Sequence, residues 1–387
     1  MKNILKNIMV IILLLAFTTL GFRNESSTKI SAVEKKDKYI VFVKQKKEIP
    51  MELQSKEVIL PELNEEILEE KKIGVVNMTN VEVKKWEKSD EMIVEKDIEV
   101  VASSKNIESE NLFGVQNMKA LGIEKNKFDS LNGYINVAVL DSGVDTNEDY
   151  NVCKRINLVK DEQKIVPYFE DLTGHGTSVV SIMTDINPNV RTYSLRVLDE
   201  NNKGHLSEIV AGIYWCIDNN IQIINMSFGT KVDSEILHEA VREAKKAGIL
   251  MIAAAGNGGE QAELEYPAAY DEVVSVGGVT QSGSISQCSS AGSRAELMGI
   301  SEDVIVDAGF SQVGVVEGTS VAVPQVTAVA AALWGKDTDK SADFIRTLLQ
   351  YSKQKNGVVN YEFASTHYKE FEKIYKAPIW LSGLKSR

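Results

Sequence analysis

Three side chains that could take part in nucleophilic or acid–base chemistry occur in the order acid, base, nucleophile along the chain. Asp141 directly follows an apolar run, His175 lies between two glycines, and Ser320 precedes a stretch of small and apolar residues. A carboxylate at the end of a strand can orient a histidine and stabilise its charged form. Asn257 follows another apolar run, and its amide could stabilise an oxyanion.

Each of these residues also has an ordinary structural explanation. Asp141 could be a turn residue that hydrogen-bonds its own backbone, Ser320 could cap a helix, and Asn257 could occupy a turn. A single histidine is more often structural, although glycine on both sides of His175 lets the backbone turn tightly and lets other groups approach. No residue by itself therefore decides the chemistry, and the surrounding elements have to be considered.

Strands and helices alternate around these residues. Apolar runs predict strands over 134–140, 193–198, 221–226 and 249–255. Apolar residues at helical spacing predict helices over 206–217 and 236–244, and Gly248 suits the C-terminal cap of the second helix. This order predicts an α/β fold with a parallel sheet covered by helices on both faces. Sites in such sheets lie at the carboxyl ends of the strands.

Two further helices are expected next to the candidate residues. The segment 177–183 is predicted to be a helix that begins close to His175. Proline is tolerated in the first turn of a helix, so Pro324 predicts that a second helix begins at or just after Ser320 and continues through 326–333. Ser320 is then expected to be exposed, beside the partial positive charge of the helix start.

Composition argues against several other classes of protein. The chain has 387 residues, of which 43% are hydrophobic and 25% charged, and a formal net charge of -12. These values are typical of a soluble globular protein and speak against a nucleic-acid partner. Cys153, Cys216 and Cys288 show no spacing that predicts a disulfide framework or a metal site. The four histidines include no His-Glu-x-x-His run, which argues against a zinc peptidase.

The first 23 residues are typical of an export signal. Lys2 and Lys6 precede the unbroken apolar run 8–17, which is shorter than the about 20 residues that span a bilayer. We therefore predict a signal peptide over residues 1–23 and a secreted protein. The alternative is an uncleaved N-terminal segment that anchors the protein at the cell surface.

Residues 24–105 differ from the rest of the chain in composition. They are rich in lysine and acidic residues and contain one glycine, Gly74, whereas 24 of the 26 glycines lie from residue 114 onward. Sequence patterns predict a small α+β unit here, with strands over 39–43, 91–94 and 98–101 and a helix over 60–73. The alternative is a solvated, charged linker. The change of composition near 101–112, where 103–106 is typical of a linker, predicts a domain boundary.

The motifs around the candidate residues resemble those of the subtilisin (subtilase) family over about residues 112–364. The family's Asp-Ser-Gly, Gly-His-Gly-Thr and Gly-Thr-Ser-x-Ala-x-Pro blocks occur at Asp141, Gly174 and Gly318, in the family's order. Three further motifs are similar to the family's, and they are Asn225-Met226-Ser227-Phe228-Gly229, Tyr266-Pro267-Ala268 and Ser275-Val276-Gly277-Gly278. Residues 39–101 resemble the inhibitory propeptide of such proteases.

The resemblance implies a fold and a domain organisation. The fold would be a subtilisin-like three-layer α/β fold with a mostly parallel central sheet, preceded by a small α+β propeptide. The domains would be a signal peptide (1–23), a propeptide (24–105), a catalytic domain (106–375) and a C-terminal tail (376–387). The protein would be a monomer that acts on polypeptides, with its own propeptide as intramolecular inhibitor and chaperone.

The resemblance also implies a serine endopeptidase that works through an acyl-enzyme. His175 would take the proton of Ser320, Asp141 would hold the histidine, and Asn257 would bind the oxyanion together with the Ser320 backbone N–H. The substrate-binding residues would be Ser227, Phe228, Gly229, Ala255, Gly256 and Glu265.

The sequence departs from the family pattern at three places. Gln325 follows Pro324 where the family often has histidine, and 297–299 replaces the usual Ala-Pro-Gly before the nucleophile. Neither change removes a catalytic group. The segment 182–190 is shorter than the loop that wraps a calcium ion in many subtilases, which puts a strong calcium site in doubt. No other metal or cofactor is expected.

Glu265 suggests a substrate preference. In relatives, the position just before the Tyr-Pro pair lies at the floor of the pocket for the residue before the scissile bond, and here that position is Glu265, with Glu263 nearby. A buried carboxylate is costly unless it is paired, so lysine or arginine is expected before the cleaved bond. The alternative is that both glutamates point to solvent.

Two other functions remain open at this point. The narrower enzymatic alternative is a maturation protease dedicated to one secreted peptide, similar to lantibiotic leader peptidases. The non-enzymatic alternative is a binding protein with a subtilase fold, which could have lost a catalytic residue, whereas this sequence retains Asp141, His175, Asn257 and Ser320.

Overall fold

The computed structural model describes residues 36–44, 71–87, 89, 91–103, 105–107, 121–122, 133–146, 150–159, 171–309 and 312–376. The predicted signal peptide, most of the helix predicted over 60–73 and nearly all of the predicted C-terminal tail lie outside these residues. Ile73, at the end of that predicted helix, is instead the first residue of a strand. No helix among the described residues is long and apolar enough to cross a membrane.

A seven-stranded parallel sheet confirms the predicted α/β fold. The strands lie in the order β14-β13-β12-β10-β6-β8-β7, and all six neighbouring pairs are parallel. Their bounds are β6 Asn136–Asp141, β7 Val152–Asn157, β8 Arg191–Arg196, β10 Ile223–Met226, β12 Leu250–Ala254, β13 Val273–Val279 and β14 Leu297–Ile300. The four strands predicted from apolar runs correspond to β6, β8, β10 and β12.

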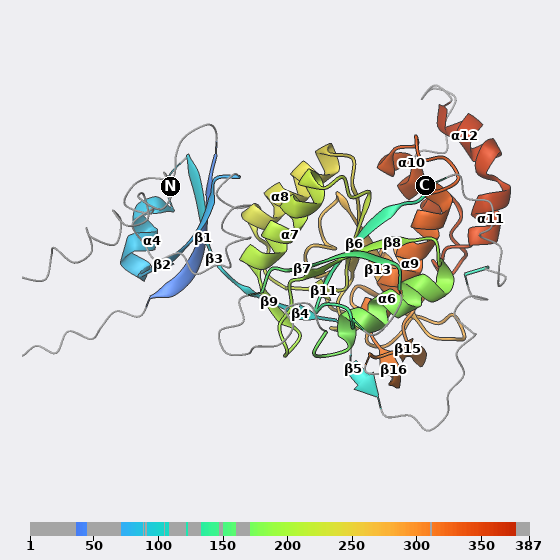
Figure 1. The fold of residues 1–387 in the computed structure, drawn as a ribbon, viewed down its shortest axis with the longest axis horizontal. Helices are drawn as coiled ribbons and strands as arrows, with labels where there is room; N and C mark the ends of the chain where they lie inside the picture. The colour runs from blue at the N-terminus through green and yellow to red at the C-terminus, as the bar shows by residue number, and fades with distance from the viewer. Residues whose placement is uncertain are drawn as a thin grey trace, which may run out of the picture. The chain divides into compact units, whose positions relative to one another are not determined.

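Helices cover both faces of this sheet and make three layers (Figure 1). Four of the helices that pack on it are α6 His175–Ile186, α7 Leu206–Asp218, α8 Glu235–Lys246 and α9 Thr319–Trp334. Side chains of β6 alternate between the two faces. Val137 and Val139 pack in the core with α6 and α9, whereas Ala138 and Leu140 pack in the core with α7 and α8. The predicted helices over 206–217 and 236–244 are confirmed as α7 and α8.

The remaining elements complete this unit. Three helices near the C-terminus are α10 Ala342–Tyr351, α11 Tyr361–Thr366 and α12 Tyr368–Lys376, and a short 3-10 helix spans Gly292–Arg294. Two small antiparallel sheets have the orders β11-β4-β9 and β15-β16-β5. Their strands are β4 Glu99–Ala102, β9 Lys203–His205, β11 Phe228–Gly229, β5 Lys105–Ile107, β15 Val304–Asp307 and β16 Val313–Glu317.

The N-terminal region forms an antiparallel sheet of order β2-β1-β3. Its elements are β1 Asp37–Val43, β2 Ile73–Met78, α4 Asn80–Trp86 and β3 Met92–Lys96. On one face, Tyr39 and Val41 pack in a cluster with Val83 of α4. On the other face, Ile40 and Val75 lie in the core that contains α7 and α8. The strands predicted at 39–43, 91–94 and 98–101 are confirmed as β1, β3 and β4.

Two carboxylates of this region cap helices of the central domain. Asp97 accepts hydrogen bonds from the Ser207 backbone N–H and hydroxyl, both at 2.9 Å, at the start of α7. Glu95 accepts from the Ser234 hydroxyl at 2.6 Å and from the Glu235 N–H at 2.8 Å, at the start of α8. The first N–H groups of a helix have no partner within it and carry partial positive charge. Both carboxylates therefore stabilise the contact between the N-terminal sheet and these helices.

The connection between α6 and β8 bears on calcium binding. It consists of residues 187–190. The Asn187 side chain donates to the carbonyl of Ala328 in α9 at 3.3 Å and accepts from the Asn189 N–H at 3.1 Å. Calcium usually takes about six to eight oxygen ligands. Among the described residues, no group of three or more His, Cys, Asp or Glu side chains could hold a metal ion.

We therefore predict that a calcium chelator changes the melting temperature by less than about 2 °C, since the loss of a strong site would cost more. The measurement is thermal unfolding with chelator, with calcium-saturated chelator as the control. A large drop that added calcium reverses would contradict this prediction.

Candidate active site

The predicted site residues meet at the carboxyl edge of the central sheet. Asp141 is the last residue of β6, Ser227 directly follows β10, and Asn257 lies just beyond β12. Parallel strands end at the same edge, so the sheet itself brings these residues to one side. His175 is the first residue of α6 and Ser320 is the second residue of α9, and these two helices pack against each other.

Asp141 and His175 form a buried pair. His175 Nδ1 lies 2.6 Å from Asp141 Oδ1, and the two residues are 6% and 1% exposed. Burial lowers the pKa of His175, but the charge and hydrogen bond of Asp141 and the charge of Asp171 outweigh burial, so this pKa is raised above its ordinary value. With its Nδ1 proton donated to Asp141, neutral His175 has Nε2 as its acceptor atom.

Two glycines allow this close approach. Gly176 has no side chain where a Cβ would lie 2.1 Å from the Gly143 carbonyl oxygen. Gly174 has a positive φ of 74°, and a Cβ there would lie 2.1 Å from the Ala308 carbonyl oxygen. Space therefore requires glycine at both positions, and at Gly174 the backbone conformation requires it as well.

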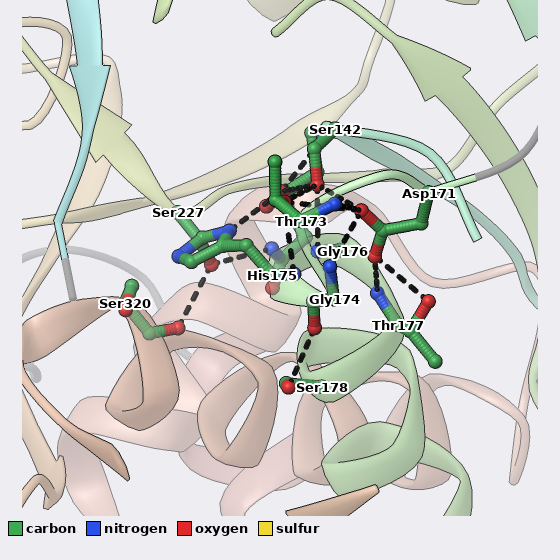
Figure 2. Close-up of polar contacts among 12 residues, drawn as sticks. Ser142, Asp171, Thr173, Gly174, His175, Gly176, Thr177, Ser178, Ser227 and Ser320 are labelled. Carbon is green, nitrogen blue, oxygen red and sulfur yellow. Dashed lines mark hydrogen bonds and ion pairs between the residues drawn. The ribbon is translucent and has the colours of Figure 1, made fainter. Parts of the chain in front are cut away.

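Pro324 lies in the interior of α9, which begins at Thr319, so the prediction that it marks the first turn was wrong. Proline has no N–H to donate to the carbonyl one turn earlier, which is that of Ser320. The Ser227 hydroxyl donates to this carbonyl instead, at 2.9 Å (Figure 2). A side chain from β10's end therefore replaces the missing backbone donor.

The prediction that Ser320 is exposed was also wrong. Its exposed fraction is 0%, because another part of the chain lies against it. The Ser320 N–H donates to the Ser103 carbonyl oxygen at 3.2 Å. In the described part of the chain, Ser320 Oγ and His175 Nε2 are both buried, and neither has a hydrogen-bond partner.

Asn257 donates to the same carbonyl oxygen. Its Nδ2 lies 2.6 Å from the Ser103 oxygen. Its Oδ1 accepts hydrogen bonds from the backbone N–H and the hydroxyl of Thr319, at 3.0 and 3.1 Å. Thr319 thereby fixes the amide orientation, and the Asn257 amide and the Ser320 N–H converge on one carbonyl oxygen.

Residues 99–103 lie between two other strands. β4 pairs antiparallel with β9 on one side and with β11 on the other. Val101 and Ala102 are in register with Gly229 and Phe228, and the Ser103 N–H donates to the Ser227 carbonyl at 3.2 Å. Three of the predicted substrate-binding residues therefore contact this strand.

The linker predicted at 103–106 does not have that character at its described residues. Ser103 is 5% exposed, and 105–107 form strand β5, which pairs with β16. Backbone partners from distant strands hold Ser103 and residues 105–107, although the polar composition of 103–106 is typical of a linker.

A pocket of about 450 Å³ opens beside Ser103. Glu265 lines it together with Gly229, Asn257, Gly258 and Lys231. A Cβ on Gly229 or on Gly256 would lie 2.5 Å from the Glu265 carboxyl group, so that group rests against both glycines. Burial raises the pKa of Glu265, whereas Lys231 lowers it, and the net direction is upward. Among the described residues, no side chain hydrogen-bonds to this carboxylate.

The other residues predicted to line the substrate site near Glu265 have different surroundings. Glu263 is exposed and pairs with Arg294 at 3.1 Å, so the alternative that it points to solvent holds for this residue. Ala255 accepts from the Glu265 N–H at 3.0 Å, and Gly256 accepts from the Thr319 hydroxyl at 3.3 Å. Ala255 and Gly256 thus support the pocket and Asn257 through these bonds.

Three polar residues of the site were missed from the sequence. Thr319 orients Asn257, and Ser142 and Asp171 belong to the hydrogen-bond network around His175 (Figure 2). Thr319 and Ser142 each adjoin a candidate residue within a quoted motif, which was the available signal. Asp171 precedes His175 by four residues, and nothing in its own sequence context distinguishes it from a turn aspartate.

Known proteins resemble this chain over the region that forms the site. The sequence model of the subtilase family matches residues 133–365. The chain is 32% identical over 313 residues to a thermostable alkaline protease of Halalkalibacterium halodurans, covering 78% of this chain and 82% of that protein.

Two relatives from Bacillus subtilis are matched over smaller shares of their length. Subtilisin E is 34% identical over 239 residues, covering 58% of this chain and 61% of the relative. Minor extracellular protease Epr is 32% identical over 212 residues, covering 52% of this chain and 32% of the relative. The chain therefore spans about a third of Epr and less than two thirds of subtilisin E.

Proposed function

The chain belongs to the subtilase family of serine endopeptidases, and on this basis we propose that it hydrolyses polypeptides with Asp141, His175 and Ser320 as its catalytic residues. One observation carries the proposal. The buried Asp141–His175 pair lies at the same sheet edge as a buried serine whose hydroxyl has no hydrogen-bond partner among the described residues. The N–H of that serine already binds a peptide carbonyl oxygen.

The first step is attack by Ser320 Oγ on the carbonyl carbon of the scissile bond. His175 Nε2 takes the hydroxyl proton as the new C–O bond forms. Asp141 holds the Nδ1–H tautomer and stabilises the imidazolium that results. Both side chains are buried, so water does not compete for these hydrogen bonds.

The negative charge that develops on the substrate carbonyl oxygen is bound by two donors. The Asn257 amide and the Ser320 N–H already converge on the Ser103 oxygen, at 2.6 and 3.2 Å. Donors fixed in this way need no reorganisation as charge develops. His175 then returns its proton to the leaving amine, and water hydrolyses the acyl-enzyme by the reverse sequence of proton transfers.

We propose that residues 99–103 occupy the substrate cleft as part of an inhibitory propeptide. β4 has the backbone pairing expected of an extended peptide substrate, and the Ser103 carbonyl occupies the oxyanion position. The bond after this carbonyl, Ser103–Ser104, is then the bond that the enzyme cleaves in its own precursor. Secretion of the precursor through the 1–23 signal fits a family that includes an extracellular protease.

We further propose that Glu265 favours lysine or arginine before the scissile bond. Its carboxylate is partly buried, carries no hydrogen bond from a described side chain, and lines the pocket beside Ser103. A substrate cation would offset the cost of burial, and a guanidinium can bind a carboxylate in two places. Ser103 is too short to use this pocket, but a tethered strand has a high effective concentration and needs less binding energy.

Ser320→Ala should lower turnover by about 10⁴-fold or more, because the nucleophile is lost. An uncut precursor would also be inactive, so the variant is first processed in trans by a trace of tagged wild type that is then removed. Ser352→Ala, at another buried serine beyond α10, is the control and should retain activity. Near wild-type hydrolysis by Ser320→Ala would contradict the assignment and reopen the alternative of a binding protein.

Processing should produce a mature N-terminus at Ser104. The measurement is intact mass and N-terminal sequencing of purified precursor, in which Ser320→Ala should keep this bond uncut. Val100→Asp should slow cleavage about tenfold or more, since Val100 is 1% exposed in the apolar core. Val101→Asp, at a side chain that is 42% exposed, is the matched control. A different N-terminus, or equal effects of the two variants, would contradict the proposed placement.

Matched peptides should be cleaved with a kcat/KM about tenfold or more higher with Arg than with Leu or Phe before the scissile bond. Glu265→Gln should remove most of this preference, whereas Glu263→Gln, at the exposed neighbour, should preserve it. A preference for Leu or Phe, or an Arg preference that survives Glu265→Gln, would rule out Glu265 as the determinant. A peptide library would also distinguish a broad endopeptidase from a dedicated maturation protease, because the latter would cleave only a narrow set of peptides.

A further inference from the structure

Asp171 is a buried carboxylate that the proposed reaction does not use directly. It is 1% exposed, and among the described residues no lysine or arginine forms a salt bridge with it. One oxygen, Oδ1, accepts from the Ser142 hydroxyl at 2.8 Å, from the Thr173 N–H and hydroxyl at 3.1 Å each, and from the Gly174 N–H at 3.0 Å. The other, Oδ2, accepts from the Thr177 N–H and hydroxyl, both at 2.8 Å.

These donors surround the start of α6, so Asp171 determines how His175 is presented (Figure 2). Thr173, held by Asp171, accepts a hydrogen bond from the His175 backbone N–H at 3.2 Å through its hydroxyl. Thr177, in the first turn of the helix, donates to Asp171 through both its N–H and its hydroxyl. The backbone on both sides of His175 is therefore attached to one carboxylate.

Asp171 also controls the proton of Ser142. The Ser142 hydroxyl has one proton and two carboxylate neighbours, Asp171 Oδ1 at 2.8 Å and Asp141 Oδ1 at 3.3 Å. The shorter contact takes the proton. Its oxygen accepts from the Gly176 N–H at 3.0 Å. Asp141 Oδ1 is thus left to accept from His175 and from the Ser142 backbone N–H.

We propose that Asp171 is a positioning residue for the reaction, which fixes His175 against Asp141 through Ser142, Thr173 and Thr177 and adds a second negative charge beside the imidazole. The proposal rests on the proposed Asp141–His175–Ser320 chemistry. Asp141 and Asp171 are the two charged groups that favour the protonated histidine among the described residues. Hydrogen bonds from three backbone N–H groups, those of Thr173, Gly174 and Thr177, and from surrounding hydroxyls offset the cost of burying the Asp171 charge.

The test is Asp171→Asn, which keeps shape but removes the charge and turns one oxygen into a donor that faces the Thr177 N–H. Activity is normalised by active-site titration with a covalent serine reagent, so that a loss of folded protein does not lower the measured kcat. We expect kcat per titrated site to fall about ten- to a hundredfold with little change in KM. We also expect the acidic limb of the kcat/KM–pH profile to move to lower pH, because removing a negative charge lowers the pKa of His175.

Asp145→Asn is the matched control. Asp145 is 2% exposed and its N–H donates to the Thr177 hydroxyl at 2.9 Å, but it is not one of the charged groups that raise the pKa of His175. This variant should leave the acidic limb in place. A merely structural role for Asp171 would lower the titratable fraction in both variants and move the limb in neither, and this result would overturn the proposal.

Ser142→Ala keeps the proposal testable if Asp171→Asn does not fold. It removes the hydroxyl that links the two carboxylates and leaves the Asp171 charge, so kcat per titrated site should fall about threefold or more while the acidic limb stays. Unchanged kcat in this variant would overturn the positioning role. Failure of the proposed function is distinguishable from failure of this proposal, because Ser320→Ala would then remain active regardless of the effect of Asp171→Asn.

Discussion

A hydrogen bond between the end of a strand and the start of a helix constrains the rest of this structure. His175 Nδ1 and Asp141 Oδ1 lie 2.6 Å apart in a buried site, and a buried carboxylate is costly unless it is paired. The approach of α6 to β6 leaves no space for a side chain at residue 176, because a Cβ there would meet the Gly143 oxygen at 2.1 Å. The close packing of α6 on the sheet, and the glycine that it requires at residue 176, therefore accompany this one hydrogen bond.

The same sheet edge holds the extended strand β4, which on our proposal is part of an inhibitory propeptide in the substrate cleft. β9 and β11 each leave one side open to pair with a third strand, and β4 fills that place. Main-chain hydrogen bonds hold such a strand whatever its side chains are, so pockets beside the strand must provide selectivity. Two carboxylates of the N-terminal region at the starts of α7 and α8 secure the strand from outside the cleft.

Acidic residues in this protein have different roles because their surroundings differ. Glu263 is exposed and paired with Arg294, so solvent screens it and it contributes little. Glu265, two residues on, is partly buried in a pocket, and its pKa is raised. Asp141 and Asp171 are both buried near His175, but Asp141 bonds the imidazole whereas Asp171 bonds the backbone and hydroxyls around it. Burial and partners, rather than residue type, separate these roles.

The sequence by itself determined the order of the elements and the residue types of the site. Apolar periodicity predicts α7 and α8, and apolar runs predict β6, β8, β10 and β12, because both signals arise from burial of one face or of both faces. Only the tertiary structure decided the burial of Ser320, the interior position of Pro324 and the part taken by Asp171. Each depends on a partner distant in the chain. Ser320 is covered by Ser103, the carbonyl that Pro324 leaves without its usual donor is bound by Ser227, 93 residues from Ser320, and Asp171 binds Ser142, 29 residues away. Local propensities act over a few residues, whereas packing chooses which distant donors and acceptors meet.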